Sequence, residues 1–188
     1  MNVRALPLFA LACALVAGCA GVTPVSQTKG NAMYWTQEFE HVLPLLGHRN
    51  WILVVDKAYP YQSAPGITTI DTKAPLTAVL EKVVADMKAS SHVKPIFYTD
   101  QELGFITEAM APGVESHRKE LARILAGTQT QTLLHDSVFA KLAEASKLFN
   151  VVILKTEGTI AYSSVFIELD CAYWNADKEA SLREKMKP

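Results

Sequence analysis

The feature of this sequence that most constrains its fold is a continuous apolar run from Trp51 to Val55, which ends at the carboxylate Asp56. A strand with one face in water would alternate apolar and polar residues. An unbroken run that includes β-branched residues is instead typical of a strand buried on both faces. Such a strand belongs to a sheet covered by helices on both sides.

Other segments along the chain alternate between strand-like and helix-like patterns. This alternation predicts a single three-layer α/β/α domain with a mostly parallel sheet. The expected strands are 51–56, 67–70, 93–98, 130–134 ending at His135, 151–155 and 164–170. The expected helices are 34–43, 76–87, one opening at 99–100 and broken at 112–113, 114–125 and 138–148.

The first residues indicate a targeting segment. Arg4 is followed by an apolar run, residues 5–16, that is shorter than the ~20 residues of a membrane-spanning helix. Residues 16–19 (Val-Ala-Gly-Cys) resemble the bacterial lipobox, in which cleavage occurs before a cysteine that carries a diacylglyceryl group. We therefore expect residues 1–18 to be a signal peptide and Cys19 to be lipidated. The alternative is an ordinary secretory signal that contains a cysteine.

A lipidated Cys19 would hold the protein outside the cytoplasm, on a membrane. Ala20 is not an inner-membrane retention signal, so the periplasmic side of the outer membrane is favoured. Residues 19–31 are then a tether rich in Gly, Thr and Pro, 32–174 the folded domain, and 175–188 a polar tail. Loss of the signal peptide and acylation of Cys19 leave Cys171 without a disulfide partner, so the domain must rely on its apolar core.

Charge and motif spacing argue against two classes of function. Lys and Arg number 18 and Asp and Glu 19, a formal net charge of −1 that is no footprint for nucleic acid. The sequence has no HExxH pattern, and Cys171 has no CxxC partner. We expect neither a metal nor a cofactor.

Polar residues near the ends of the expected strands are the candidates for chemistry. Asp56 ends the first strand, His135 ends a later one, and His48 lies in the turn before the first. Loops at the carboxyl ends of parallel strands commonly form binding sites. Taken singly, each residue is more often a cap or a surface hydrogen-bonding group.

Longer stretches of sequence resemble one family. Residues 46–60 (LGHRNWILVVDKAYP) contain Gly-His, a hydrophobic strand ending in Asp, and a Pro four residues later. Residues 70–71 match a short second strand, and 151–156 with 161–165 match a closing segment. Together these segments resemble the ribose pyranase and fucose mutarotase family.

The resemblance implies a ring-shaped homo-oligomer with sites between neighbouring subunits. It implies pyranose–furanose and anomer interconversion of free monosaccharides without metal or cofactor. By this resemblance His48 matches the proton-transferring histidine, Asp56 the sugar-binding carboxylate and Tyr162 the aromatic residue that closes the site. His135 matches a second polar residue, although its interval to Tyr162 is longer here, and Ser164 stands where the family usually has Asn.

The residue types suit this chemistry independently of the family. A hemiacetal opens when a proton leaves the anomeric hydroxyl and another reaches the ring oxygen, which a histidine can carry near neutrality. A carboxylate accepts sugar hydroxyls, and an aromatic ring covers an apolar sugar face. The sequence thus favours a lipid-anchored monosaccharide mutarotase. Its alternatives are a non-catalytic monosaccharide-binding lipoprotein and a structural envelope oligomer.

Overall fold

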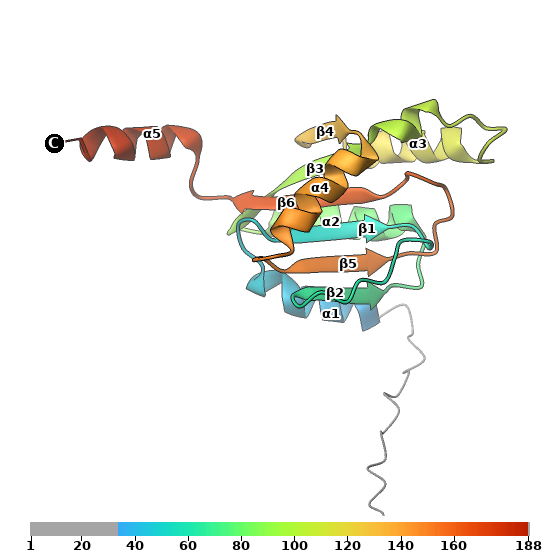
Figure 1. The fold of residues 1–188 in the computed structure, drawn as a ribbon, viewed down its shortest axis with the longest axis horizontal. Coiled ribbons are helices and arrows are strands. Elements are labelled where there is room, and N and C mark those ends of the chain that lie inside the picture. Colours follow the sequence, from blue (N-terminus) through green and yellow to red (C-terminus); the bar gives the residue numbers. More distant parts are fainter. Residues whose placement is uncertain (1–33, 188) are drawn as a thin grey trace, which may run out of the picture.

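The computed structural model describes residues 34–187, which form an α/β domain followed by a separate helix (Figure 1). The segments expected to be a signal peptide and a tether, and Cys19 between them, lie outside the described residues. The strands are β1 (Trp51–Val55), β2 (Ile67–Asp71), β3 (Val93–Asp100), β4 (Thr130–Leu133), β5 (Val151–Lys155) and β6 (Val165–Cys171). The α-helices are α1 (Tyr34–Val42), α2 (Leu76–Ala89), α3 (Val114–Ile124), α4 (His135–Ala145) and α5 (Ala176–Lys185), with 3-10 helices at Leu43–Leu45 and Gln101–Phe105.

The six strands form one sheet in the order β2-β5-β1-β6-β3-β4. β2, β5 and β1 pair in parallel, as do β3 and β4. β6 lies between β1 and β3 and is antiparallel to both. The expected mostly parallel sheet is therefore confirmed, and the start of β6 lies at the edge where the other five strands end.

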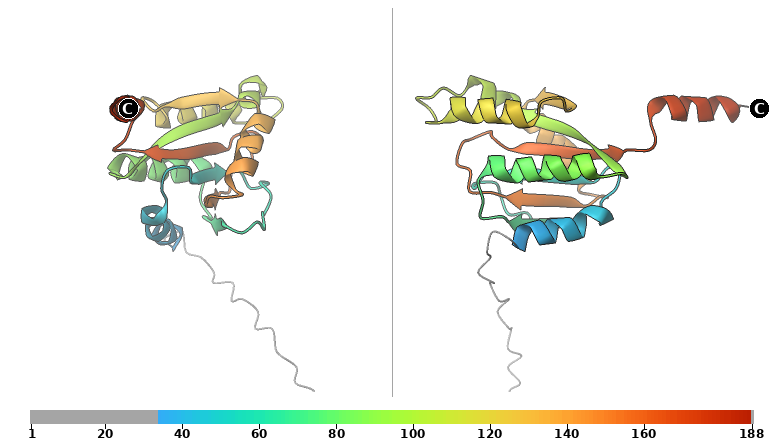
Figure 2. Two further views of the ribbon diagram at one scale, coloured as in Figure 1. Left: turned by 60° about the vertical axis from the view of Figure 1, so that its left-hand side comes forward. Right: turned by 180° about the vertical axis from the view of Figure 1, so that it is seen from behind.

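Helices cover both faces of this sheet, as the two further views show (Figure 2). Helices α1, α2 and α3 pack on one face and α4 on the other. Alternate residues of β1 enter the two cores: Ile52 and Val54 face α2, whereas Leu53 faces α4. The apolar run of β1 thus has the physical cause inferred from the sequence, because both of its faces are buried.

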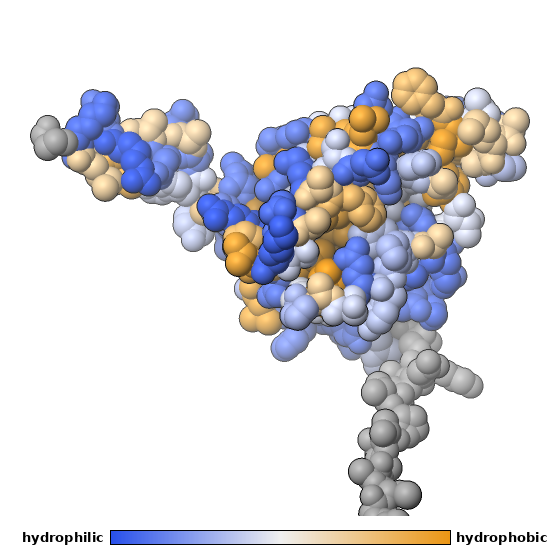
Figure 3. Space-filling model, in the orientation of Figure 1, coloured by the Kyte–Doolittle hydropathy of each residue, from blue (hydrophilic) through white to orange (hydrophobic). Residues whose placement is uncertain are grey.

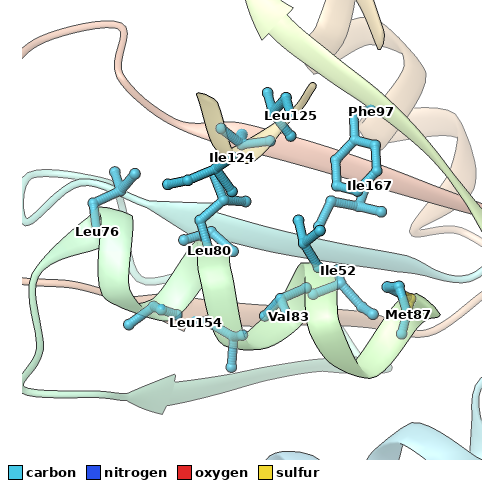
Figure 4. Close-up of a cluster of buried hydrophobic side chains, with 14 of the residues drawn as sticks. Ile52, Leu76, Leu80, Val83, Met87, Phe97, Ile124, Leu125, Leu154 and Ile167 are labelled. Atoms are coloured by element: carbon cyan, nitrogen blue, oxygen red, sulfur yellow. The ribbon is translucent and has the colours of Figure 1, made fainter. Parts of the chain in front are cut away.

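The larger core lies between the sheet and helices α1 to α3 (Figure 4). Leu76, Leu80, Val83 and Met87 recur at helical spacing along α2 and point at the sheet. Pro75 stands just before α2, where its missing N–H breaks no helical hydrogen bond. The smaller core on the other face includes two side chains of α4, Val138 and Leu142.

Three expectations differ from the structure. The strand expected to end at Tyr98 continues to Asp100, because Thr99 and Asp100 pair with Thr132 and Leu133 of β4. A short 3-10 helix follows in place of the longer helix expected there. His135 is the first residue of α4 rather than the end of a strand.

Helix α5 projects from the end of β6 and stands apart from the rest of the domain (Figure 1). Asn175 caps it by accepting a hydrogen bond from the backbone N–H of Lys178 at 2.9 Å. The segment expected to be a polar tail is therefore helical over Ala176–Lys185. In the part of the chain from Tyr34 to Lys187, no helix has the length and apolar character to cross a membrane.

Candidate functional site

An open pocket of about 730 Å³ lies where the segments that follow β1 and β5 meet the start of α4. Three of the sequence-predicted residues, Asp56, His135 and Tyr162, are in its wall. Its remaining lining residues are Lys57, Ala58, Tyr59, Pro60, Phe139, Thr159, Ile160 and Ala161. The volume is in the range of small-molecule sites, and the carboxyl ends of parallel strands are where such sites occur.

Asp56 follows β1 directly and is held in place through both carboxylate oxygens. Oδ1 accepts a hydrogen bond from the backbone N–H of Ala58 at 2.8 Å. Oδ2 accepts one from Ser164 Oγ at 3.1 Å, and the same Oγ accepts the backbone N–H of Asp56 at 3.3 Å. Each carboxylate oxygen has a further lone pair, so an oriented Asp56 can still accept ligand hydroxyls.

Ser164 is placed differently from the other predicted residues. It is buried, with 2 % of its surface exposed, and it is not among the residues of the pocket wall. It lies just before β6, which brings it beside the end of β1. Ser164 therefore contacts the site through Asp56, which it orients.

His135 is held on its backbone and on its ring. Both carboxylate oxygens of Glu102 lie 3.1 Å from its backbone nitrogen, at the otherwise open start of α4. Its Nδ1 lies 2.8 Å from Oδ2 of Asp100. The ring packs on Phe139, with centroids 4.4 Å apart, and meets Tyr162 edge-on at 5.2 Å.

Asp100 is the carboxylate that pairs with the His135 ring. It ends β3, and its side chain is fully buried. Burial, assisted by the charges of Glu102 and Asp56, raises the pKa of Asp100 to about 6 against the opposing hydrogen bond and charge of His135. A buried carboxylate paired with a half-buried histidine at a pocket is an arrangement that recurs in active sites.

Tyr162 adopts a backbone conformation that is rare for a residue with a side chain, with φ of 58°. The conformation turns the chain between β5 and β6 so that the ring lies at the pocket, 39 % exposed. Ser163 Oγ stabilises the turn by donating to the carbonyl of Ile160 at 2.6 Å. Strain of this kind persists where the surrounding structure enforces it and is common at functional sites.

Aromatic side chains supply apolar surface to the pocket. Tyr59 and Phe139 lie with ring centroids 5.7 Å apart. Lys155 Nζ donates to the carbonyl of Tyr59 at 2.7 Å and so fixes the segment after β1. Burial raises the pKa of Tyr59 to about 12, so its hydroxyl stays protonated at neutral pH. Figure 3, a space-filling view in the orientation of Figure 1, shows hydrophobic residues near the middle of the face that α4 crosses.

His48 lies away from the other predicted residues, in the exposed turn before β1. Burial tends to raise the pKa of Asp170, but Lys94, assisted by the backbone N–H of Cys171 and the charge of His48, holds that pKa below its ordinary value. Asp170 lies near the end of β6. Because β6 is antiparallel to β1, this end lies beside the start of β1, whereas the pocket lies where β1 ends. Within one chain the structure therefore brings Asp56, His135 and Tyr162 together and leaves His48 outside.

Sequence reasoning missed Asp100, Glu102 and Phe139. Asp100 ends a strand just as Asp56 does, so the same rule could have selected it had the end of β3 been placed correctly. Glu168 and Asp170 lie on β6, which is a central strand of the sheet. Glu168 accepts the hydroxyl of Tyr98 at 2.8 Å, and Asp170 pairs with Lys94 at 3.0 Å. Among residues 34–187, no group of three or more His, Cys, Asp or Glu side chains is placed to hold a metal ion.

The sequence matches no protein-family model and no curated protein. Solved structures give matches. RbsD of Bacillus subtilis, complexed with D-ribose, is 18% identical over 70% of this chain and 89% of its own, with a TM-score of 0.49. The fucose mutarotase of Streptococcus pneumoniae, in complex with L-fucose, is 15% identical over 75% and 96%, also with a TM-score of 0.49. FucU of Bifidobacterium longum is 14% identical over 70% and 90%, with a TM-score of 0.46.

Proposed function

We propose that this protein is a lipid-anchored, extracytoplasmic monosaccharide mutarotase or pyranase, which interconverts anomers or ring forms by histidine acid–base catalysis. One observation carries the proposal: a carboxylate, an imidazole and an aromatic ring, those of Asp56, His135 and Tyr162, line one open pocket. In the proposal, Asp56 binds sugar hydroxyls and Tyr162 covers an apolar face of the sugar. The sugar class comes from the sequence resemblance over residues 46–60.

Because His48 lies outside the pocket of its own chain, the proposal requires a homo-oligomer. Strand β1 alone spans about 13 Å, so His48 and Asp56 lie too far apart in one chain to contact the same small sugar. His48 acts in this proposal from a neighbouring copy, in a ring-shaped homo-oligomer whose sites lie between subunits. Ring opening moves two protons, one from the anomeric hydroxyl and one to the ring oxygen, so two histidines from two copies suit the reaction.

The test is saturation-transfer NMR of anomer exchange with the purified protein and ribose, fucose, galactose and glucose. We expect faster exchange for at least one sugar. Tyr162→Phe should accelerate exchange as well, because it retains the aromatic ring that covers the sugar in this proposal. Exchange at the uncatalysed rate for every sugar, together with no measurable sugar binding, would leave the structural envelope oligomer as the remaining function.

A binding-only function is the second candidate, and the placement of Ser164 favours it. Ser164 is bound to Asp56 beneath the pocket, so the pocket lacks the amide that Asn would supply in the resembling family. This candidate predicts measurable sugar affinity without faster exchange. It also predicts that Ser164→Asn gains exchange activity if the larger side chain reaches the pocket.

A further inference from the structure

Three side chains contact the ring of His135, and a fourth contacts its backbone. Asp100 contacts Nδ1, Phe139 packs on one side of the ring and Tyr162 meets it edge-on. Glu102 fixes the backbone from which the side chain projects. Such support from several elements is what holds a reacting group in one geometry, whereas a simple helix cap needs only the contact of Glu102 with the backbone.

The chemistry of Asp100 decides which nitrogen of His135 carries the proton. An ionised carboxylate can only accept hydrogen bonds, so the Nδ1 that faces it must be the protonated nitrogen. Nε2 then has a free lone pair, and it has no hydrogen-bond partner among residues 34–187. Because His135 is part of the pocket wall and its side chain is 33% exposed, Nε2 is the basic atom available to a ligand there.

We propose that His135 transfers the proton at the anomeric centre and that Asp100 is its positioning residue, an inference that rests on the proposed function. Asp100 holds the ring in the tautomer that leaves Nε2 unprotonated and stabilises the imidazolium formed when Nε2 accepts a proton. This gives His135 a role beyond the sugar contact expected from the sequence, and it gives a role to Asp100.

The step balances as follows. Nε2 of His135 accepts the proton of the anomeric hydroxyl, the bond between the anomeric carbon and the ring oxygen breaks, and the hydroxyl oxygen becomes a carbonyl. The electron pair of the broken bond stays on the ring oxygen, which takes a proton from His48 of a neighbouring copy. After rotation of the open chain, the ring closes on the other face, or through another hydroxyl, with both proton transfers reversed.

The test combines three variants of the full-length protein with two readouts. Asp100→Asn removes the positioning charge, and His135→Gln removes the base. Asp136→Asn is the control, because it removes the same charge from an exposed residue in the first turn of α4 without touching the ring. The readouts are anomer exchange and the ¹⁵N chemical shifts of the His135 ring, which report its tautomer whether or not sugar is present.

We expect wild-type His135 to carry its proton on Nδ1 and Asp100→Asn to shift it toward Nε2. Asp100→Asn should slow exchange ~10- to 100-fold with sugar affinity little changed, as for loss of a group that orients a reacting residue. His135→Gln should slow exchange by ~10² to 10⁴. Asp136→Asn should leave both readouts unchanged.

A purely structural pair would give a different result. If wild-type His135 carries its proton on Nε2, or if Asp100→Asn slows exchange no more than Asp136→Asn does, the inference is overturned while the proposed function stands. If the wild-type protein accelerates no sugar, the proposed function fails and the catalytic role of His135 fails with it. Should Asp100→Asn not fold, the wild-type tautomer and the His135→Gln rate decide the matter.

Discussion

His48 and Asp56 stand at opposite ends of one strand: His48 lies in the turn that enters β1, and Asp56 is the residue that follows it. Eight positions in the sequence separate them, and most of that interval is extended chain. The family resemblance places these two residues in one site. In a single chain they lie at opposite ends of β1 and therefore on opposite sides of the sheet. A shared function for them requires two copies of the chain.

Mixed oligomers test this shared site. We expect His48→Ala and Asp56→Asn each to lose most exchange activity, because each removes one side of every site. A mixture of the two variants, dissociated and reassembled, should recover part of the wild-type rate, since some sites then combine an intact Asp56 with an intact His48. A mixture no more active than its components, or a monodisperse monomer by light scattering, would contradict the shared site.

Acylation of Cys19 is the prediction for the N-terminal segment. Labelling with a palmitate analogue should mark the wild-type protein expressed in a bacterial host, because residues 16–19 resemble a lipobox, in which the cysteine is the residue that is modified. Cys19→Ser should be unlabelled and leave the membrane fraction, whereas Cys171→Ser, the control, should behave as wild type. Equal labelling of wild type and Cys19→Ser would rule out this site of attachment.

The elements predicted best from the sequence are those whose cause is local. Strand β5 (Val151–Lys155) has its expected bounds, because residues 151–154 are an apolar run buried on both faces. The end of β3 could not be predicted, since Thr99 and Asp100 are extended by pairing with β4, some thirty residues away. The central position of β6 is likewise a matter of long-range pairing, which its alternating residues do not encode.

The site was predictable to a similar extent. Asp56, His135 and Tyr162 line one pocket because the carboxyl ends of parallel strands meet at one edge of the sheet. The role of Asp100 depends on the side-chain pairing of β3 with α4, for which no sequence pattern exists. The place of His48 follows from the length of β1 and could have been inferred from it.

Ser164 should act on the sugar through Asp56. We expect Ser164→Ala to weaken sugar affinity several-fold, because Asp56 Oδ2 loses the hydroxyl that orients it. The lost hydrogen bond should also lower the free energy of unfolding by about 1 kcal/mol. Ser146→Ala, which removes an exposed hydroxyl at the end of α4, is the control for a serine away from the pocket. Calorimetric titration with the active sugar measures the affinity, and an unchanged affinity would separate Ser164 from the site.

The ionisation of Asp100 should make the protein less stable as the pH rises. Burial raises the pKa of Asp100 to about 6 from its ordinary 3.8, so the unfolded chain releases this proton at lower pH than the folded protein does. The contribution of Asp100 to the free energy of unfolding therefore falls as the pH rises from about 4 to about 6.

Replacing the carboxyl removes this pH dependence. Asp100→Asn should resemble the wild type in stability near pH 4 and exceed it by about 1–2 kcal/mol at pH 7, where the buried charge is present only in the wild type. Urea unfolding of both proteins from pH 4 to pH 8 measures the difference. Together with slower exchange, the result would show a positioning group retained at a cost in stability. A constant difference across this range would mean that Asp100 does not titrate with a raised pKa.

Tyr162 combines backbone strain with a ring at the pocket, and two substitutions separate these properties. Tyr162→Ala removes the ring and keeps a Cβ at φ of 58°, whereas Tyr162→Gly removes the ring and relieves the strain. We expect the glycine variant to be about 1 kcal/mol more stable than the alanine variant, because a left-handed conformation costs a residue with a Cβ about that much. Both should lose sugar affinity to the same extent, since the ring is what covers the sugar, while Tyr162→Phe should retain most of it.

Thermal unfolding and sugar titration of the three variants measure these effects. Equal stability of the glycine and alanine variants would show that the turn carries no strain, and full affinity without the ring would place the sugar elsewhere in the pocket.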